Sequence, residues 1–286
     1  MRSTVRWKTK RIGVVVCGSI QLLRIEIPNI ENLLELQNRR CHTRSVLGAG
    51  CKALAVVSIL VATTRSGWAL TSIIAVRTST SLVLGADSLT TRWDGSEASL
   101  GCKIHEAAKV FSAFALVTGA AGTGFDLPRI AADALECKGT LRERIQQVTV
   151  GLTVCLEALR RFEVPFFSRR ANGNTVSEAV FLGFEDGEPK MLVRWFAARL
   201  ENGRVHVHRH SLDCPRDCVD GTLAVNLGYH QMQVLPGLWN RDVPAVAERL
   251  IERARASHPA QVAGPIAIVQ IDHDGVRWLR SGMCRP

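Results

Sequence analysis

The fold of this chain is decided by residues 71–88, which read TSIIAVRTSTSLVLGADS. Residues 73–76 and 82–84 are apolar and largely β-branched, and the Thr and Ser residues between them suit a tight turn, so the stretch predicts a β-hairpin. Thr71 stands at the head of the first strand and Asp87 follows the second, with Lys103 sixteen residues further on. A hydroxyl, a carboxylate and an ammonium in these places suggest a nucleophile with supporting charges.

The charge of the chain is unevenly distributed. Of its 286 residues, 47% are hydrophobic and 22% charged, which is typical of globular domains. Residues 1–70 carry 11 Lys and Arg against 3 Asp and Glu, whereas residues 71–286 carry 25 against 23. The net charge of +10 therefore belongs mainly to the first 70 residues. Aromatic residues are sparse and offer no basic, stacking platform, so we expect no nucleic-acid partner.

Residues 1–70 are predicted to form a basic leader. Residues 53–64 are an uncharged, mostly apolar run between Lys52 and Arg65, and small residues follow at Gly67 and Ala69. This order is typical of a secretory signal, and the run is too short for a stable membrane span. We therefore expect a secreted or periplasmic protein if residues 44–69 are a signal peptide, and a cytoplasmic one otherwise. A disordered leader, a propeptide and a membrane-tethered form remain alternatives.

Nine cysteines are present, six of them after Thr71: Cys102, Cys137, Cys155, Cys214, Cys218 and Cys284. An even number suits disulfides in an exported protein without proving them. Cys214 and Cys218 bracket three residues and could close a small loop, although two free buried thiols fit equally well.

The order of predicted elements indicates the fold class. Strands are expected at 103–107 and 110–118, helices at 127–137 and from 140 onward, and a loop at 166–173. The rest is strands at 178–184, 191–198, 204–212, 222–227, 265–271 and 276–279, interrupted by a helix at 243–256. Segregated blocks of strands and helices predict an α+β domain over residues 71–286, with helices layered on antiparallel sheets.

The pattern that begins at Thr71 resembles the N-terminal nucleophile (Ntn) hydrolases, above all the proteasome β subunits and the peptidase subunit of the related bacterial ATP-dependent protease. Thr71, Asp87 and Lys103 match the family spacing without a gap, and Gly119 follows the next strand pair in a Gly-rich turn. The likeness is specific over residues 71–137. It implies a four-layer αββα sandwich with two antiparallel sheets flanked by helices.

The resemblance also implies roles for these residues. Thr71 would be the nucleophile, with its free α-amine as base once residues 1–70 are removed, because such an amine has a pKa near ~8. Lys103 would stabilise negative charge, and Asp87 would keep Lys103 charged and oriented. The Gly119 N–H would serve the oxyanion hole, and Thr91 and Gly119 would flank a peptide substrate as an added strand. This chemistry requires no cofactor and no metal.

Three departures from the family pattern leave alternatives open. One is the signal-like leader, because the proteasomes of the family work inside cells as stacked rings. Leu70 precedes Thr71 where relatives have Gly, so a cut after Ala69 would still leave Leu70 blocking the amine. The supporting Ser and Asp side chains of the family are also not found around Gly228 and Gly264. We therefore expect a threonine peptidase that acts on a peptide or small amide. Such a peptidase could assemble as a homo-oligomer. A degenerate binding or assembly protein and an exported hydrolase of a non-peptide amide remain alternatives.

His206, His208 and His210 share one face of a predicted strand, and Cys214 and Cys218 follow. Such a row can contribute to a metal site. Alternating His residues are more common on a solvated strand face, so no metal site is predicted.

Overall fold

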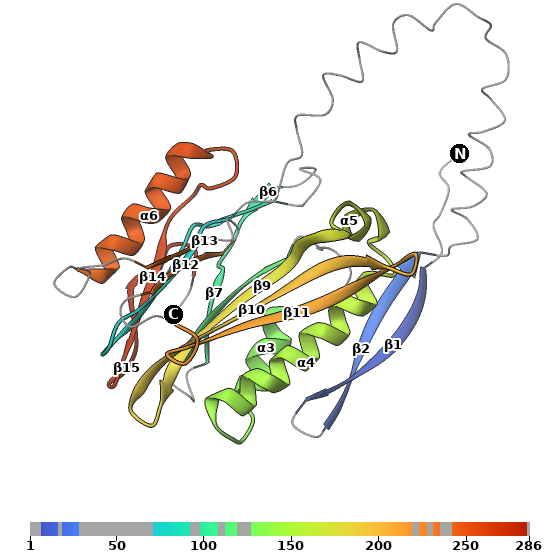
Figure 1. The fold of residues 1–286 in the computed structure, drawn as a ribbon, viewed down its shortest axis with the longest axis horizontal. Helices are drawn as coiled ribbons and strands as arrows, with labels where there is room; N and C mark the ends of the chain where they lie inside the picture. Colours follow the sequence, from blue (N-terminus) through green and yellow to red (C-terminus); the bar gives the residue numbers. More distant parts are fainter. Residues whose placement is uncertain are drawn as a thin grey trace, which may run out of the picture.

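The computed structural model describes residues 7–16, 19–28, 71–91, 98–107, 112–118, 127–218, 223–227, 231–234 and 242–284. The chain has an α+β fold with antiparallel sheets and few helices, as the order of elements predicted. Figure 1 shows two large sheets, with α6 on one side of the molecule and α3 and α4 on the other.

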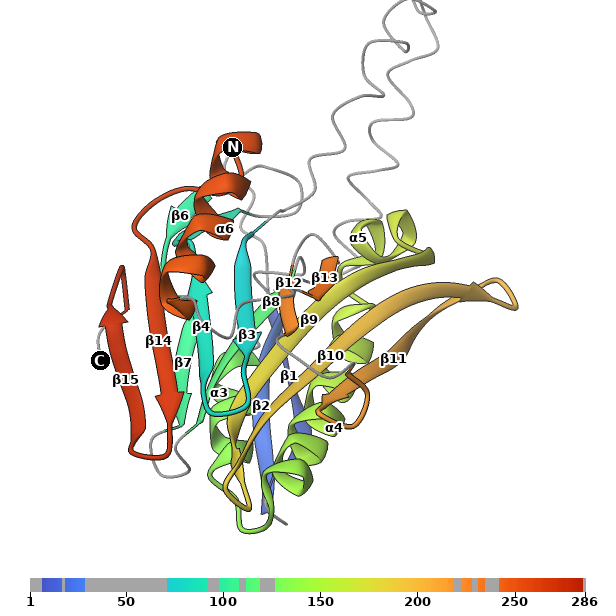
Figure 2. The same cartoon turned by 60° about the vertical axis from the view of Figure 1, so that its left-hand side comes forward.

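The first large sheet has six strands in the order β13-β12-β3-β4-β14-β15, and all its neighbouring strands are antiparallel. The predicted hairpin of residues 71–88 forms its centre. Figure 2 shows β15, β14, β4 and β3 side by side, with α6 lying across them. The strands are β3 (Ile73–Arg77), β4 (Leu82–Ala86), β12 (Leu223–Leu227), β13 (Gln231–Val234), β14 (Ala267–Asp272) and β15 (Gly275–Arg280).

The second large sheet has five antiparallel strands in the order β11-β10-β9-β8-β7. Its long strands β9, β10 and β11 are joined by two tight turns, each containing an Asx-Gly pair with positive φ: Asp186-Gly187 and Asn202-Gly203. The strands are β7 (Ile104–Ala107), β8 (Ser112–Thr118), β9 (Asn172–Glu185), β10 (Glu188–Glu201) and β11 (Arg204–Cys214).

The described helices are α3 (Leu127–Leu135), α4 (Leu141–Leu159), α5 (Val164–Arg169) and α6 (Val243–Ser257). Thr140 caps α4: its side chain accepts a hydrogen bond from the Glu143 N–H, and the Glu143 carboxylate accepts one from the Thr140 N–H. In α6 the carboxylate of Asp242 accepts from the Ala245 N–H. These caps explain why both helices begin where they do.

Three apolar clusters hold the elements together. One lies between α3, α4, α5 and the five-stranded sheet. A second joins the facing sides of the two sheets, where Ile73 and Leu84 of the six-stranded sheet meet Val180 and Leu182 of the other. The third packs α6 on the opposite side of β3, β4 and β14. The central strands β3 and β4 are therefore buried on both faces, which agrees with their continuous apolar sequence.

Three parts of the described chain after Thr71 differ from the predictions. The first residues of the expected loop at 166–173 belong to α5, whose Phe166 and Phe167 are both buried and contact each other edge to face. Residues 89–100, where no strand was predicted, contain a small pair of strands, β5 (Leu89–Thr91) and β6 (Ala98–Leu100). Strand β13 was not predicted at all. The α5 helix forms where two phenylalanines are buried against the core. It was missed because this burial depends on the tertiary fold, which the composition of the segment does not reveal.

Part of the predicted leader also forms an antiparallel pair. Strands β1 (Trp7–Val16) and β2 (Ser19–Pro28) pair along their whole length, and β1 lies alongside α4 (Figure 1). Residues 1–45 had no clean hydrophobic period, and this pair was not predicted. The apolar run at 53–64 lies outside the described residues.

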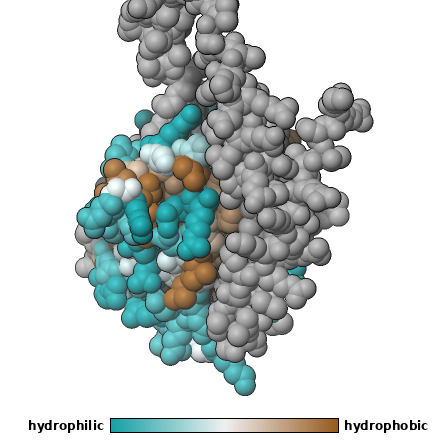
Figure 3. Space-filling model, turned by 90° about the vertical axis from the view of Figure 1, so that its right-hand side faces the viewer, coloured by the Kyte–Doolittle hydropathy of each residue, from teal (hydrophilic) through white to brown (hydrophobic). Residues whose placement is uncertain are grey.

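Within the described ranges, no helix is long and apolar enough to cross a bilayer. On the face drawn in Figure 3, the coloured hydrophobic side chains lie in separate groups among hydrophilic ones. Scattered apolar side chains of this kind are normal on protein surfaces.

Candidate functional site

The register of the β3–β4 hairpin brings Thr71 and Asp87 together. Ile73 pairs with Ala86, so the residues just beyond this pair, Ser72 and Asp87, face each other at the open end of the hairpin. The Asp87 N–H donates to the Ser72 carbonyl at 3.2 Å. The Thr71 hydroxyl donates to Oδ1 of Asp87 at 3.0 Å. The spacing of sixteen residues therefore has a structural cause: it is the length of this hairpin.

Lys103 reaches the same point from the other sheet. It directly precedes β7, which runs close to β4 although the two strands belong to different sheets. Its Nζ donates to Oδ1 of Asp87 at 2.7 Å and also contacts the Thr71 Oγ1. One hydroxyl can donate one hydrogen bond and accept others, so Thr71 can serve both partners at once. The structure thus brings together the three residues that the sequence singled out.

The three side chains are withdrawn from water. Thr71 is 6% exposed, Asp87 1% and Lys103 8%. Burial lowers the pKa of the Lys103 ammonium below its ordinary value, and the attraction and hydrogen bond of Asp87 raise the pKa only part of the way back. Lys103 therefore loses its proton more readily than an exposed lysine does.

The Asp87 carboxylate is held by backbone N–H groups on both oxygens. Oδ1 accepts from Ser72 at 2.9 Å, and Oδ2 accepts from Leu89 at 3.1 Å and from Ala263 at 3.3 Å. An ionised carboxylate can only accept hydrogen bonds, and here it meets only donors. This arrangement fixes the orientation of the side chain relative to Lys103.

The segment that supplies Ala263 was not predicted to be part of the site. The Ala263 carbonyl accepts from the Ser88 and Leu89 N–H groups, and the Ser88 hydroxyl donates to the Pro265 carbonyl at 2.5 Å. Gly264 lies between them with φ +80°. The segment around Gly264 contributes to the site through backbone groups, so its side chains gave no signal in the sequence. The Gly-Pro pair just before β14 was the feature that could have drawn attention to it.

The other predicted residues are only partly described. Thr91 lies at the end of β5, opposite Ala98, on the strand that leaves the site after Leu89. Gly119, Ala69 and Leu70 lie outside the described residues, so their roles as oxyanion donor and processing positions stay predictions.

The row of histidines lies on the edge strand β11. His208 Nε2 is 2.8 Å from a carboxylate oxygen of Glu201, and the His210 ring stacks on Trp195. Across the described part of the chain, no three His, Cys, Asp or Glu side chains are grouped so that they could hold a metal ion. The row therefore gives no support to a metal site.

Two disulfides can be assigned among the described cysteines. Cys102 is bonded to Cys284, and Cys214 is bonded to Cys218, which closes the small loop considered from the sequence. Cys155 is a free, buried thiol, and burial raises its pKa to about 12. Cys155 is therefore a neutral core residue at physiological pH.

Chemically, the arrangement can support attack by a hydroxyl. A threonine hydroxyl is a weak nucleophile until a neighbouring base takes its proton. In the 286-residue chain the Thr71 nitrogen forms a peptide bond with Leu70, so it becomes a base only after that bond is cut. Lys103 and Asp87 are placed to hold charge around the hydroxyl, within a water-poor site where electrostatic effects are strong.

No protein-family model matches this chain, and no curated protein matches it either. The class of protein is therefore inferred from the geometry of the site and from the sequence pattern alone.

Proposed function

We propose that this chain is an N-terminal-threonine amidohydrolase of the Ntn-hydrolase type, and specifically a proteasome-like peptidase. The observation that carries the proposal is the contact between the Thr71 hydroxyl, the Asp87 carboxylate and the Lys103 ammonium. Three polar groups with this spacing, from two different sheets, share one buried point. Burial of polar groups is costly unless they are well paired, so such a cluster is a functional-site candidate.

The same proposal includes the finer fold. The apolar clusters lie between α3 and α4 and one sheet, between the two sheets, and between the other sheet and α6. This succession supports a four-layer αββα sandwich of the Ntn-hydrolase type. In that fold the nucleophile stands at the head of a central strand, which is where Thr71 precedes β3.

The proposed reaction begins with removal of residues 1–70, which frees the Thr71 α-amine. The amine takes the hydroxyl proton while Oγ1 attacks the carbonyl carbon of a peptide or small amide. It then gives that proton to the departing nitrogen as the C–N bond breaks, which leaves an acyl-enzyme ester and releases the amine product. Water then hydrolyses the ester and restores Thr71. Lys103 stabilises developing negative charge, and Asp87 keeps Lys103 in place; the Gly119 N–H is proposed as oxyanion donor.

The second candidate is a non-catalytic protein of the same fold that acts in binding or assembly. It is favoured by one observation: the segment around Gly264 reaches Asp87 through the backbone N–H of Ala263, and the supporting Ser and Asp side chains that the family resemblance implies are not found there. Leu70 before Thr71 also differs from the expected Gly. For either candidate, an exported location is proposed, because disulfides persist in oxidising compartments.

Covalent labelling separates the two candidates. A β-lactone probe acylates activated hydroxyls, and peptide mapping by mass spectrometry locates the adduct. We expect labelling on a peptide that begins at Thr71 and none in Thr71→Ala. Thr80→Ala is the matched control, because Thr80 is an exposed threonine in the turn of the same hairpin, and it should label like the unaltered protein. Absence of labelling at Thr71 in the unaltered protein would favour the non-catalytic candidate.

A further inference from the structure

The site is assembled across two sheets, and the crossing point is short. Thr71 and Asp87 flank the strands of the six-stranded sheet, whereas Lys103 precedes the first residue of β7 in the five-stranded sheet. The Gly101 N–H still donates to the Ser88 carbonyl at 2.9 Å, and Ile104 already pairs with Ala115. The chain therefore passes from the β5–β6 pair, beside the end of β4, into the five-stranded sheet within residues 101–104, and Lys103 lies in that passage.

The Cys102–Cys284 disulfide lies in the same passage. It joins residues 182 positions apart in the sequence, and Cys102 is the immediate neighbour of Lys103. Cys284 is 5% exposed and belongs to the apolar cluster between the two sheets. The bond therefore ties the backbone next to Lys103 to the turn at the end of the described chain.

That turn is itself seated against the segment that supports Asp87. Residues 281–284 are closed by a hydrogen bond from the Cys284 N–H to the Ser281 carbonyl at 2.7 Å. Gly282 packs so closely on the start of β14 that an added Cβ would lie 2.9 Å from the Ala267 nitrogen and 3.0 Å from the Ile266 carbonyl carbon. The residues just before Ile266 supply the Ala263 N–H to Asp87 and the Pro265 carbonyl to Ser88.

We propose that the Cys102–Cys284 disulfide is a positioning element of the site: it fixes Lys103 relative to Thr71 and Asp87 by linking the passage at 101–104 to the backbone that holds Asp87. Neither cysteine touches substrate in this account. The proposal rests on the proposed function for its effect on catalysis, while its effect on Lys103 itself does not depend on any activity.

The test measures Lys103 directly. Acetic anhydride acylates neutral amines, and peptide mapping gives the labelling rate of each lysine between pH 7 and pH 11. In the unaltered protein we expect the midpoint for Lys103 to lie below the ordinary lysine value of about 10.4. In Cys102→Ala/Cys284→Val, whose apolar replacements keep the local packing, we expect the midpoint to move upward as Lys103 gains water. The exposed Lys138 should not change in either protein.

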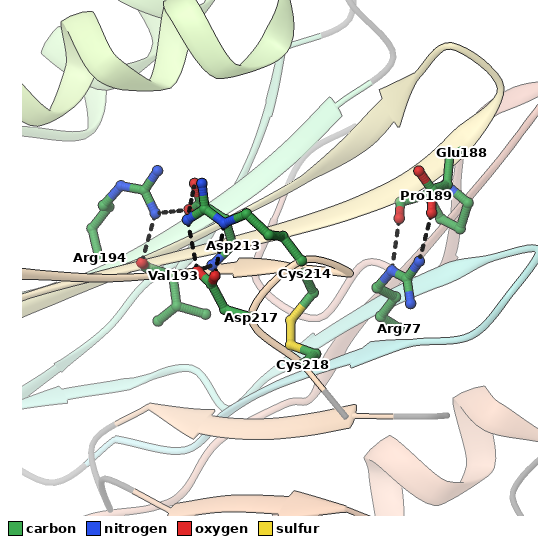
Figure 4. The surroundings of a disulfide bond; sticks show 10 residues. Arg77, Glu188, Pro189, Val193, Arg194, Asp213, Cys214, Asp217 and Cys218 are labelled. Carbon is green, nitrogen blue, oxygen red and sulfur yellow. Dashed lines mark hydrogen bonds and ion pairs between the residues drawn. A yellow bond between two sulfur atoms is a disulfide. The ribbon is translucent and has the colours of Figure 1, made fainter. Parts of the chain in front are cut away.

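The second disulfide provides the matched control. Cys214–Cys218 joins residues four apart at the end of the edge strand β11, next to the Arg194–Asp213 pair (Figure 4). Cys214→Ala/Cys218→Ala should leave the Lys103 midpoint unchanged. In a peptidase assay the Cys102/Cys284 variant should lose between about tenfold and a hundredfold in kcat with KM little changed, since misplacement of a charged group chiefly affects the transition state.

Two outcomes have opposite meanings. A raised Lys103 midpoint supports the positioning role even in a protein that shows no hydrolysis, in which case only the proposed function fails. An unchanged midpoint and unchanged kcat in the folded variant would overturn the proposal. If the variant does not fold, the unaltered protein is labelled in a short pulse with dithiothreitol, which adds two hydrogen atoms to the sulfur pair and becomes a cyclic disulfide. An upward shift of the Lys103 midpoint in the reduced protein would support the positioning role, and an unchanged midpoint would overturn it.

Discussion

Two buried ion pairs of this molecule invite comparison: Lys103–Asp87 between the sheets and Arg194–Asp213 at the edge of one sheet. Their shortest N–O distances are 2.7 and 2.5 Å, and all four side chains are largely buried. Arg194 also donates to the Val193 carbonyl, so that pair is contained within the neighbouring strands β10 and β11 (Figure 4).

The partners of the two pairs differ in kind. The Asp213 carboxylate also lies 3.5 Å from the Arg216 guanidinium and 4.0 Å from that of Arg142. Its partners are therefore charged arginine side chains. Asp87 is surrounded by backbone N–H groups and by the Thr71 hydroxyl. A buried ion pair alone is weak support for stability or for function. What distinguishes the Lys103–Asp87 pair is the hydroxyl that both members contact.

The largest expected difference concerns the two aspartates. Both oxygens of Asp87 accept backbone hydrogen bonds, so in Asp87→Asn the amide NH₂ must face a donor, and Lys103 loses its counter-charge. We expect a loss of about 3–5 kcal/mol in the free energy of unfolding, and loss of Thr71 labelling. Asp213→Asn also removes the counter-charge of a buried cation, Arg194, so it should cost a similar amount, but with labelling unchanged. Urea unfolding measures the two costs and probe labelling measures the chemistry; loss of Thr71 labelling in Asp213→Asn would remove the distinction.

The next difference concerns the two cations. Lys103→Met leaves Asp87 with its N–H donors, so we expect a stability cost of only about 1–2 kcal/mol. Labelling of Thr71 should nevertheless slow by about 10²- to 10³-fold, because the charge beside the hydroxyl is gone. Arg194→Met should have a similar stability cost without slowing the labelling. A Lys103→Met protein that labels at the normal rate would show that Lys103 has no chemical role.

A glycine beside the site and a glycine in a distant turn give a smaller contrast. An alanine at Gly264 combines positive φ with a Cβ only 2.8 Å from Leu100 Cδ2 and 3.3 Å from Ser88 Cβ. We expect Gly264→Ala to cost about 2–3 kcal/mol in unfolding free energy and to slow labelling at Thr71. At Gly203, in the β10–β11 turn, φ is also positive but no atom lies within 4 Å of the added Cβ. Gly203→Ala should cost about 1 kcal/mol, without effect on labelling.

The smallest effect is a dependence of stability on pH. The folded-state pKa of Lys103 is lowered by burial, so between that pKa and about 10.4 the unfolded state binds more protons than the folded state. The contribution of Lys103 to stability must therefore rise with pH through this interval, by at most about 1.4 kcal/mol per pH unit. It is lost as the pH falls through the folded-state pKa. The measurement is the difference in unfolding free energy between the unaltered protein and Lys103→Met; a flat difference would contradict it.

The sequence indicated which polar side chains come together better than it indicated their surroundings. Thr71 and Asp87 could be placed because their separation is fixed by one local hairpin, and hairpin signals are short-range. That Lys103 would meet them was inferred from the resemblance to a family, since no local sequence rule connects two sheets. The long strands β9, β10 and β11 were also predicted in order, although each extends beyond its predicted range.

What could not be predicted depends on contacts distant in sequence. The N–H of Ala263 donates to Asp87, which lies 176 positions away in the sequence. Almost every residue has a backbone N–H, so the residue type does not show which one binds a carboxylate. The pairing of Cys102 with Cys284 could not be chosen from six cysteines without coordinates. The α5 helix forms because Phe166 and Phe167 are buried, which a local pattern does not show.

The central claim is that Thr71 becomes the first residue of the working protein. Intact mass measurement together with N-terminal sequencing of the purified mature protein tests it directly. We expect a chain that begins at Thr71, with its hydroxyl still beside Asp87 and Lys103. A mature, folded protein that still carries Leu70 on the Thr71 nitrogen would contradict it.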